Sequence, residues 1–257
     1  MFKLARSVIS VGTAIGLCLA ASSAPAGAVF HKPRVPADRG ARGTSAGWAS
    51  SNWSGYAVTG ATGHFTSASG SWVVQAVAPS RKATYSSQWV GIDGFNDSDL
   101  IQTGTGSDYY SGSAHYAAWW EILPAAETVI PSITVHPGDH MSASVAQTSG
   151  STWTITISDT TTGVSFSTAQ TYTGPQTSAE WIEEAPSVGG HIATLANYGK
   201  ATFDPGTANG ADPGLTAADG GVMIQRNAQV STPSAPDSDT DGFNVQYGST
   251  APTPPGS

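Results

Sequence analysis

The chain has 257 residues, of which only 11% are charged and 39% are hydrophobic, with 8 Trp, 8 Tyr and a single Cys. It has too many aromatic residues and too few charges for an intrinsically disordered protein, and it lacks the excess of basic residues typical of nucleic-acid binding. One cysteine excludes an intrachain disulfide framework and a Cys-x-x-Cys metal site.

The charge is unevenly distributed along the chain. Six of the ten Lys and Arg residues lie within the first 42 positions. From Gly43 onward the chain contains 17 acidic and four basic residues, a net charge of −13. The whole-chain net charge of −8 therefore averages a basic N-terminus with a strongly acidic body.

Residues 1–28 have the features of a secretory signal peptide. Two basic residues precede an apolar run over 8–21, and the Ala-Gly-Ala sequence at 26–28 fits a cleavage site. The apolar run is shorter than the ~20 residues of a membrane-spanning helix. We therefore expect a secreted, extracellular protein with no membrane association after cleavage. Because Cys18 lies within the signal peptide, the mature protein should contain no cysteine.

Residues 29–45 form a second distinct segment, which is basic, contains Pro and Gly, and has almost no apolar periodicity. Two interpretations remain open for this leader. It is either a segment without fixed structure or a short propeptide that lies on the acidic body through charge complementarity.

The body, residues 46–248, has the pattern of many short β-strands in a single domain. Stretches rich in Val, Ile, Thr, Trp and Tyr alternate with Gly, Ser, Asn and Asp clusters, and no segment has capped helical periodicity. We predict an all-β sandwich or barrel. A surface loop is expected over 206–221 and a Pro-rich tail over 249–257. The expected strands are 70–77, 87–92, 114–122, 132–135, 141–147, 152–158, 163–172, 179–183, 191–198, 222–225 and 242–247.

Familiar catalytic and metal-binding motifs are missing from the body. It contains no His-Glu-x-x-His and no P-loop sequence, and its His residues have no recognised metal spacing. We expect no metal and no other cofactor. A Ser/His/Asp triad stays open on composition, although no local motif supports one.

Four polar side chains stand within apolar strand sequence: Asp93, Gln102, Glu121 and Glu180. Burying a carboxylate or an amide in such surroundings is costly unless it is partnered, and burial raises the pKa of a carboxyl. A raised carboxyl pKa suits general acid–base catalysis. Strand alternation could instead place Glu180 on a solvated face.

The order and spacing of five motifs resemble the eqolisin family of glutamic peptidases over about 51–247. Each motif is weak alone, but the set is fairly specific. They are Ser-Asn-Trp-Ser-Gly-Tyr at 51–56, Gln-Trp-Val-Gly-Ile-Asp-Gly at 88–94, Leu-Ile-Gln-Thr-Gly at 100–104, Ala-Trp-Trp-Glu at 118–121 and Ala-Glu-Trp-Ile-Glu at 179–183.

The resemblance implies a sandwich of two large, curved antiparallel sheets of the jelly-roll or concanavalin-like kind. It implies a catalytic dyad of Gln102 and Glu180, with Trp89, Asp93 and Glu121 lining or supporting the substrate cleft. The expected activity is an acid endopeptidase that cleaves proteins or peptides as a monomer. The mature chain lacks the disulfides of the best-known fungal members, and its pro-segment is far shorter than theirs.

In the implied mechanism, Glu180 takes a proton from the attacking water and returns it to the leaving amine. Gln102 stabilises the oxyanion. A Glu carboxylate with an ordinary pKa favours an acidic optimum. The neighbours Glu183 and Glu184 are expected to be solvated, as charged residues usually are.

Other functions also fit parts of the sequence. The many Trp and Tyr residues could provide stacking platforms in a carbohydrate-binding module. Glu121 and Glu180 could form the carboxylate pair of a glycosidase, although Gln102 then has no role. The chain could also be an inactive family member acting as an adhesin or inhibitor.

Overall fold

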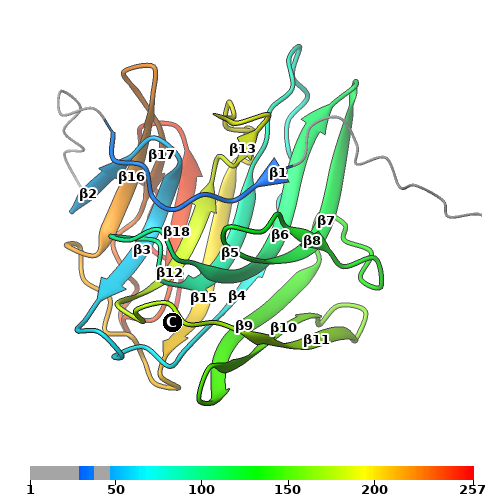
Figure 1. Cartoon of the computed structure of the whole chain (residues 1–257). Coiled ribbons are helices and arrows are strands. Elements are labelled where there is room, and N and C mark those ends of the chain that lie inside the picture. The colour runs from blue at the N-terminus through cyan, green and yellow to red at the C-terminus, as the bar shows by residue number, and fades with distance from the viewer. Residues whose placement is uncertain (1–28, 38–46) are drawn as a thin grey trace, which may run out of the picture.

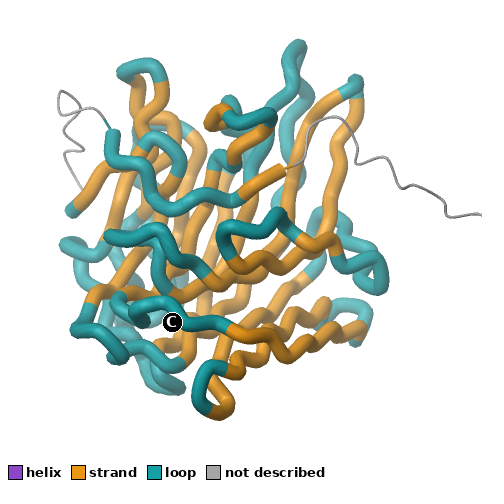
Figure 2. Tube along the Cα trace, viewed as in Figure 1, coloured by secondary structure: helices purple, strands orange, loops and turns teal. Residues whose placement is uncertain are grey.

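The computed structural model describes residues 29–37 and 47–257. The predicted signal peptide and most of the rest of the leader lie outside the described residues. The described part consists of strands and loops (Figures 1 and 2), and it includes no helix that is long and apolar enough to cross a membrane.

The strands follow one another through short turns and longer loops. In chain order they are β1 (Val29–Phe30), β2 (Trp48–Ser50), β3 (Trp53–Thr59), β4 (Ser67–Val73), β5 (Ser87–Ile92), β6 (Ile101–Tyr110), β7 (Ser113–Ile122), β8 (Thr128–Val129), β9 (His140–Ser149), β10 (Thr152–Asp159), β11 (Val164–Thr171), β12 (Ser178–Glu184), β13 (Ser187–Val188), β14 (His191–Ile192), β15 (Lys200–Ala208), β16 (Gly220–Gln225), β17 (Ala228–Pro233) and β18 (Phe243–Tyr247).

Most of these strands belong to one hydrogen-bonded sheet, which folds over on itself. Its order runs β11-β10-β9-β4-β15-β18-β17-β16-β3-β12-β5-β6-β7-β8, and β2 joins it beside β16. Strands β4 and β9 from the first half pack against β5 and β6 from the second half. The predicted all-β sandwich of antiparallel sheets is therefore confirmed, with β16 and β17 linking the two layers. We call the layer β3-β12-β5-β6-β7-β8 the site layer.

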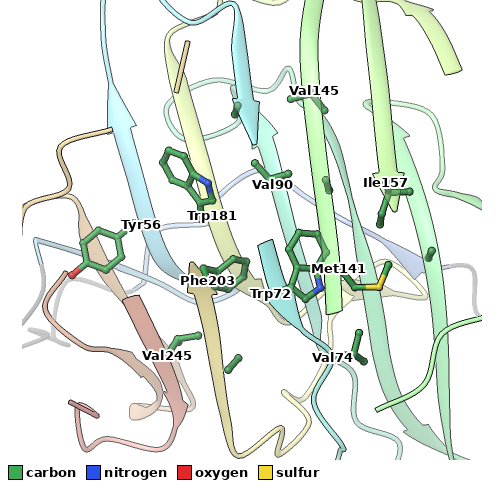
Figure 3. Close-up of a cluster of buried hydrophobic side chains, with 14 of the residues drawn as sticks. Tyr56, Trp72, Val74, Val90, Met141, Val145, Ile157, Trp181, Phe203 and Val245 are labelled. Atoms are coloured by element: carbon green, nitrogen blue, oxygen red, sulfur yellow. The ribbon is translucent and has the colours of Figure 1, made fainter. Parts of the chain in front are cut away.

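The main core lies between the two layers and is built by period-two alternation. In β10, Trp153, Ile155 and Ile157 are buried while the Thr and Ser residues between them are partly exposed or exposed, as the sequence predicted. Figure 3 shows the same core around Trp181 of β12 and Phe203 of β15. Each large apolar side chain buried in this way contributes about 1.5–3 kcal/mol.

A second apolar cluster lies on the opposite face of the site layer. It consists of Trp53, Trp89, Leu100, Trp119 and Ile182, with Trp48, Phe95 and Leu123 packed against it. Strand β12 is consequently buried on both faces. The face of the site layer that points away from the main core must therefore be covered by other parts of the chain.

Some strand predictions were wrong. Residues 132–135 form no strand, because Ile133 and Val135 are buried as loop side chains that pack into the core without backbone pairing. The segment predicted as 191–198 pairs as a strand only over its first two residues. Strands β3, β6, β15 and β17 were not predicted, and the expected 206–221 loop begins inside β15. The C-terminal tail is held by Asn244, whose Nδ2 donates to the carbonyl oxygen of Thr253 (2.8 Å).

Candidate active site

Three of the four polar candidates lie in one row across the site layer. Glu180 of β12 pairs with Gly91 of β5, Gly91 pairs with Gln102 of β6, and Gln102 pairs with Glu121 of β7. Residues paired in this way point to the same face of a sheet. The fold therefore brings Gln102, Glu180 and Glu121 together from segments far apart in the sequence.

Gly91 lies between the two proposed dyad residues and has no side chain. Neighbouring strands are about 4.8 Å apart, so the Cα atoms of Glu180 and Gln102 are separated by roughly 9.6 Å. A Cβ at Gly91 would lie 3.1 Å from Gln102 Cβ and 3.0 Å from both Trp89 Cζ3 and the carbonyl oxygen of Ile101. Glycine keeps the space between the Glu and the Gln open for their side chains.

The row is fully buried and only partly hydrogen-bonded. Gln102, Glu121 and Glu180 each have 0% exposed surface. Gln102 Nε2 donates to Glu121 Oε2 (2.8 Å). Gln102 Oε1, Glu121 Oε1 and both carboxyl oxygens of Glu180 have no partner among the described residues. Unpartnered buried polar atoms are rare in proteins and mark positions where a reacting group can be bound.

Burial dominates the electrostatics of the two carboxyls. It raises the pKa of Glu180 well above 4.5, and the nearby charges of Asp93 and Asp97 raise it further. Burial also raises the pKa of Glu121 to about 8, against the opposing effect of His31. Both carboxyls therefore favour the neutral form while they are buried. The alternative that Glu180 faces solvent is wrong.

Trp89 and Asp93, the other two predicted cleft residues, lie outside this row. Trp89 belongs to the outer apolar cluster and its Nε1 donates to Glu184 Oε2 (2.8 Å). The carboxylate of Asp93 accepts hydrogen bonds from the Tyr172 hydroxyl (2.6 Å) and from the backbone N–H groups of Gln176 (2.8 Å) and Thr177 (2.7 Å). Asp93 thus fixes the segment that enters β12, and direct contact with substrate stays a prediction for both residues.

The expectation that Glu183 and Glu184 are solvated is wrong, since both are buried. They lie on opposite faces of β12 because strand side chains alternate. Glu183 points to the other side, where burial raises its pKa well above 4.5. Glu184 shares the face of Glu180. Sequence alternation could have placed Glu184 there, but only the fold shows what covers it.

Part of the leader covers this face of the site layer. Residues 29–37, here called the leader segment, begin with β1, which pairs antiparallel with β13 (Val29 with Val188). The segment then crosses the site layer toward β2 (blue in Figure 1). The carbonyl oxygen of Lys32 accepts a hydrogen bond from Trp53 Nε1 (2.9 Å), and Arg34 N donates to the carbonyl oxygen of Gly94 (3.0 Å).

His31 makes the most extensive side-chain contacts of the leader segment. Its ring stacks on Trp119 with centroids 3.7 Å apart, and its backbone N donates to Glu121 Oε2 (3.2 Å). The ring nitrogens lie 3.1 Å from Glu184 Oε2 and 3.0 Å from Glu127 Oε2. Burial alone would lower the pKa of His31, but hydrogen bonds and charges from Glu127 and Glu184 raise it to about 10. The imidazole is therefore a buried cation beside the dyad row.

His31 also lines a pocket of about 790 Å³. Its lining includes Trp119, Glu127, Asp108 and Tyr85. Burial, followed by the charge of Glu127, raises the pKa of Asp108 to about 7. The pocket is therefore lined by both acidic and aromatic side chains, and its lining includes His31, whose backbone N donates to Glu121 of the row.

The family model for the Peptidase A4 family matches residues 51–247, which include every strand from β3 to β18. The chain belongs to the Peptidase A4 family. The predicted resemblance to glutamic peptidases is thereby confirmed, and the protein is a peptide hydrolase, a glutamic endopeptidase that acts on proteins or peptides. The leader segment lies outside the part that the Peptidase A4 model matches.

Solved structures of glutamic peptidases have the same fold as this Peptidase A4 chain. A scytalido-glutamic peptidase with a transition-state analogue inhibitor is 25% identical, with a TM-score of 0.66, covering 77% of this chain and 98% of its own. Aspergilloglutamic peptidase from Aspergillus niger is 26% identical, with a TM-score of 0.53, covering 64% of this chain and 99% of its own. SCP-B of the eqolisin family, in complex with the tripeptide Ala-Ile-His, is 24% identical with a TM-score of 0.60, covering 77% of this chain and 98% of its own. A search of curated proteins finds no match.

Proposed function

We propose that the protein is a secreted acid endopeptidase in which Glu180 is the general base and acid and Gln102 stabilises the oxyanion. The observation that carries this proposal is the row across Gly91. It has a carboxyl with two unpartnered oxygens and an amide with an unpartnered oxygen on one face of three adjacent strands. Secretion is supported by the sequence of residues 1–28, which has the features of a signal peptide.

The chemistry follows from the hydrogen-bonding capacity of each group. Ionised Glu180 takes a proton from a water molecule as the water attacks the scissile carbonyl. A glutamine amide has two N–H donors. One of those of Gln102 is held by Glu121, so the second can donate to the developing oxyanion. Protonated Glu180 then gives its proton to the leaving amine, which breaks the peptide bond and restores the carboxylate.

In this proposal Glu121 is a positioning residue. Its Oε2 accepts from Gln102 Nε2 and thereby fixes which end of the amide is the donor. Oε1 of Gln102 stays free to accept a hydrogen bond from the attacking water. A neutral Glu121, favoured by its raised pKa, still has an oxygen that can accept this bond.

The leader segment explains how such a site is kept inactive. A general base must be ionised, but burial holds the pKa of Glu180 well above its ordinary value while the cleft is covered. When the leader segment leaves and water enters, the pKa falls toward the ordinary glutamate value of about 4.3. Residues 29–37 thus act as a propeptide, and the uncovered enzyme works at acidic pH.

A two-carboxylate glycosidase is disfavoured by the same row. Glu121 and Glu180 are three strands apart, so their Cα atoms are separated by roughly 14 Å. The amide of Gln102 lies between them and is hydrogen-bonded to Glu121. In a glycosidase the two carboxyl groups flank the scissile bond directly, and an amide bonded to one of them has no assigned role.

The test compares two substitutions in β12. Glu180→Gln should abolish hydrolysis of a denatured protein at acidic pH after removal of the leader. Glu183→Gln is the matched control, because it makes the same chemical change three residues along the same strand, on the opposite face. It should retain activity within about threefold. Full activity in Glu180→Gln with an intact fold by circular dichroism would refute the dyad.

A further inference from the structure

The loop between β17 and β18 is acidic, and none of its residues belongs to the dyad row. Its sequence is Asp237-Ser238-Asp239-Thr240-Asp241-Gly242. Calcium-binding loops place oxygen ligands at alternate positions 1, 3 and 5 and a glycine at position 6. The spacing of this loop is the same. The chain then continues into β18 rather than into a helix, and no Glu stands at the twelfth position.

The fold adds a carboxylate from another strand. Asp204 of β15 lies beside the loop, and one carboxylate oxygen each from Asp204, Asp237 and Asp241 lies within 4.8 Å of the other two. Calcium binds oxygen ligands at about 2.3–2.6 Å, so two ligands on one ion are at most about 5 Å apart. The three oxygens are therefore close enough to share one ion.

Asp237 provides a second and independent indication of a ligand. Its side chain is 6% exposed. Its Oδ1 accepts hydrogen bonds from the backbone N–H groups of Asp241 and Gly242, but its Oδ2 has no partner among the described residues. Oδ1 of Asp241 is also buried and unpartnered. A buried carboxylate oxygen that lacks a partner is unfavourable, and a cation is the group that would remove this cost.

The space beside these oxygens is kept open by a glycine. A Cβ at Gly242 would lie 2.3 Å from Asp237 Oδ2 and 2.9 Å from Asp204 Cγ. The position therefore cannot carry a side chain while the carboxylates stay where they are.

Among the residues that the structure describes, no basic side chain forms an ion pair with this loop. The ion pairs of the described residues involve only His31 and His136, both outside this loop. The loop is also anchored to β15, since Gly206 N donates to the carbonyl oxygen of Asp241 (2.8 Å). The repelling carboxylates are therefore held together by the backbone.

We propose that Asp204, Asp237 and Asp241 bind a calcium ion that ties the β17–β18 loop to β15. A set of hard oxygen donors suits Ca²⁺, Mg²⁺ or Mn²⁺ rather than Zn²⁺ or Cu²⁺. An irregular loop suits Ca²⁺, because Mg²⁺ requires near-ideal octahedral geometry. Without a bidentate Glu, the expected dissociation constant is in the range of extracellular modules, roughly 10⁻⁴–10⁻³ M.

The test is calcium binding by the full-length protein after dialysis against EDTA. Isothermal titration with CaCl2 should show one site. CaCl2 at about 100 times the dissociation constant should raise the melting temperature by roughly 5–10 °C. An equal concentration of MgCl2 should raise it by less than half as much. No heat and no shift with CaCl2 would overturn the proposal, and an equal shift with MgCl2 would overturn the assignment to calcium.

Two substitutions and one control complete the experiment. Asp241→Asn and Asp204→Asn should each weaken calcium binding at least tenfold. In EDTA they should melt at or above the wild-type temperature, because each removes a charge that its neighbours repel. Asp99→Asn, which neutralises an exposed aspartate in the 93–100 loop, should bind calcium as the wild type does. Wild-type affinity in either Asp241→Asn or Asp204→Asn would show that these carboxylates are not ligands.

Discussion

At the scale of single residues, the lack of a side chain at Gly91 leaves room for the side chains of Glu180 and Gln102. Gly91 separates Glu180 from Gln102, and three neighbours already lie within about 3 Å of where its Cβ would be. Its backbone is ordinary β-strand, so the glycine is not required by a left-handed conformation. The need for glycine comes from the side chains on either side of it.

Gly91→Ala should therefore lower kcat by about tenfold or more while the protein still folds. The added methyl group has to displace Gln102 or Trp89 by a few tenths of an ångström, and overpacking of this kind costs about 1–3 kcal/mol. Misplacing a catalytic group by a similar amount can be far more damaging to the rate than to the fold. The measurement is kcat on a peptide substrate together with the melting temperature.

Gly106→Ala is the matched control in the same layer. A Cβ there would meet only Asp108 Oδ2, at 4.0 Å. Wild-type kcat is expected for this variant. Equal kcat values for the two alanine variants would contradict the role assigned to Gly91.

At the scale of elements, backbone hydrogen bonds hold the leader segment along its length, and His31 makes its main side-chain contacts with acidic groups. A basic leader and an acidic body are complementary in charge, and His31 of the leader contacts three glutamates. Lys32 and Arg34 contribute differently. No side-chain hydrogen bond or ion pair joins Lys32 to the described residues, and Arg34 lies over the Phe95 ring (4.2 Å) with its Nε donating to the Phe95 carbonyl.

His31→Ala should raise the activity of the unprocessed protein by about tenfold or more. Removing one partner of a buried ion pair costs about 3–5 kcal/mol, and here that cost falls on the covered state. The measurement is the initial rate of peptide hydrolysis before any cleavage of the leader. Lys32→Ala is the control and should leave the rate unchanged. Equal rates in all three proteins would show that His31 does not hold the segment in place.

The pH dependence of docking has a definite sign. The folded-state pKa of His31 is about 10, above its ordinary value of 6.5. Its contribution to docking is therefore full below pH 6.5 and is lost as the pH rises through 10. Limited proteolysis or hydrogen exchange of residues 29–37 should show increasing exposure over that range. Constant protection from pH 6 to pH 10 would contradict this assignment.

The sequence predicted strands with strong alternation but missed β3, β6, β15 and β17. Strand β10 alternates Trp and Ile with Thr and is correctly predicted. Strand β6 reads Ile-Gln-Thr-Gly-Thr-Gly-Ser-Asp-Tyr-Tyr, and its burial depends on partners in β5 and β7 that no local pattern reveals. Likewise, the Asp-x-Asp-x-Asp-Gly run is visible in the sequence, but only the fold places Asp204 beside it.

For the site, too, local sequence patterns predicted only part of what the fold shows. Family motifs pointed to Gln102 and Glu180, and in the structure strand alternation puts Glu180 and Glu184 on one face. The solvation of Glu184 was predicted wrongly, because the leader segment that covers it is remote in sequence. Residue type and spacing indicate which face a side chain occupies, whereas its burial depends on what packs over that face.

At the scale of the whole molecule, the buried carboxyls make the folded state more stable at acidic pH than at neutral pH. Glu121 has a pKa raised from 4.5 to about 8, and Asp108 from 3.8 to about 7. Glu180 and Glu183 are shifted in the same direction. A raised pKa in the folded state gives stability that is full below the ordinary value and is lost as the pH rises through the folded value.

The melting temperature should therefore be highest near pH 4 and should fall toward pH 8, by at least about 5 °C. The measurement is thermal unfolding in EDTA, followed by circular dichroism at constant ionic strength. Glu183→Gln should reduce this fall, because it replaces a buried carboxyl by a neutral group of the same shape. A melting temperature that is constant or rises between pH 4 and pH 8 would contradict the raised pKa values.

The leader segment is joined covalently to the body whose cleft it covers, and this affects activation kinetics. A tethered segment competes at an effective concentration that is typically millimolar for a short linker, whatever the protein concentration. A single cut between Ala37 and Gly47 would leave every contact of the segment in place but make it a separate peptide. Its dissociation would then depend on dilution. One cleavage event would thus convert a permanently covered enzyme into one that becomes active as it disperses.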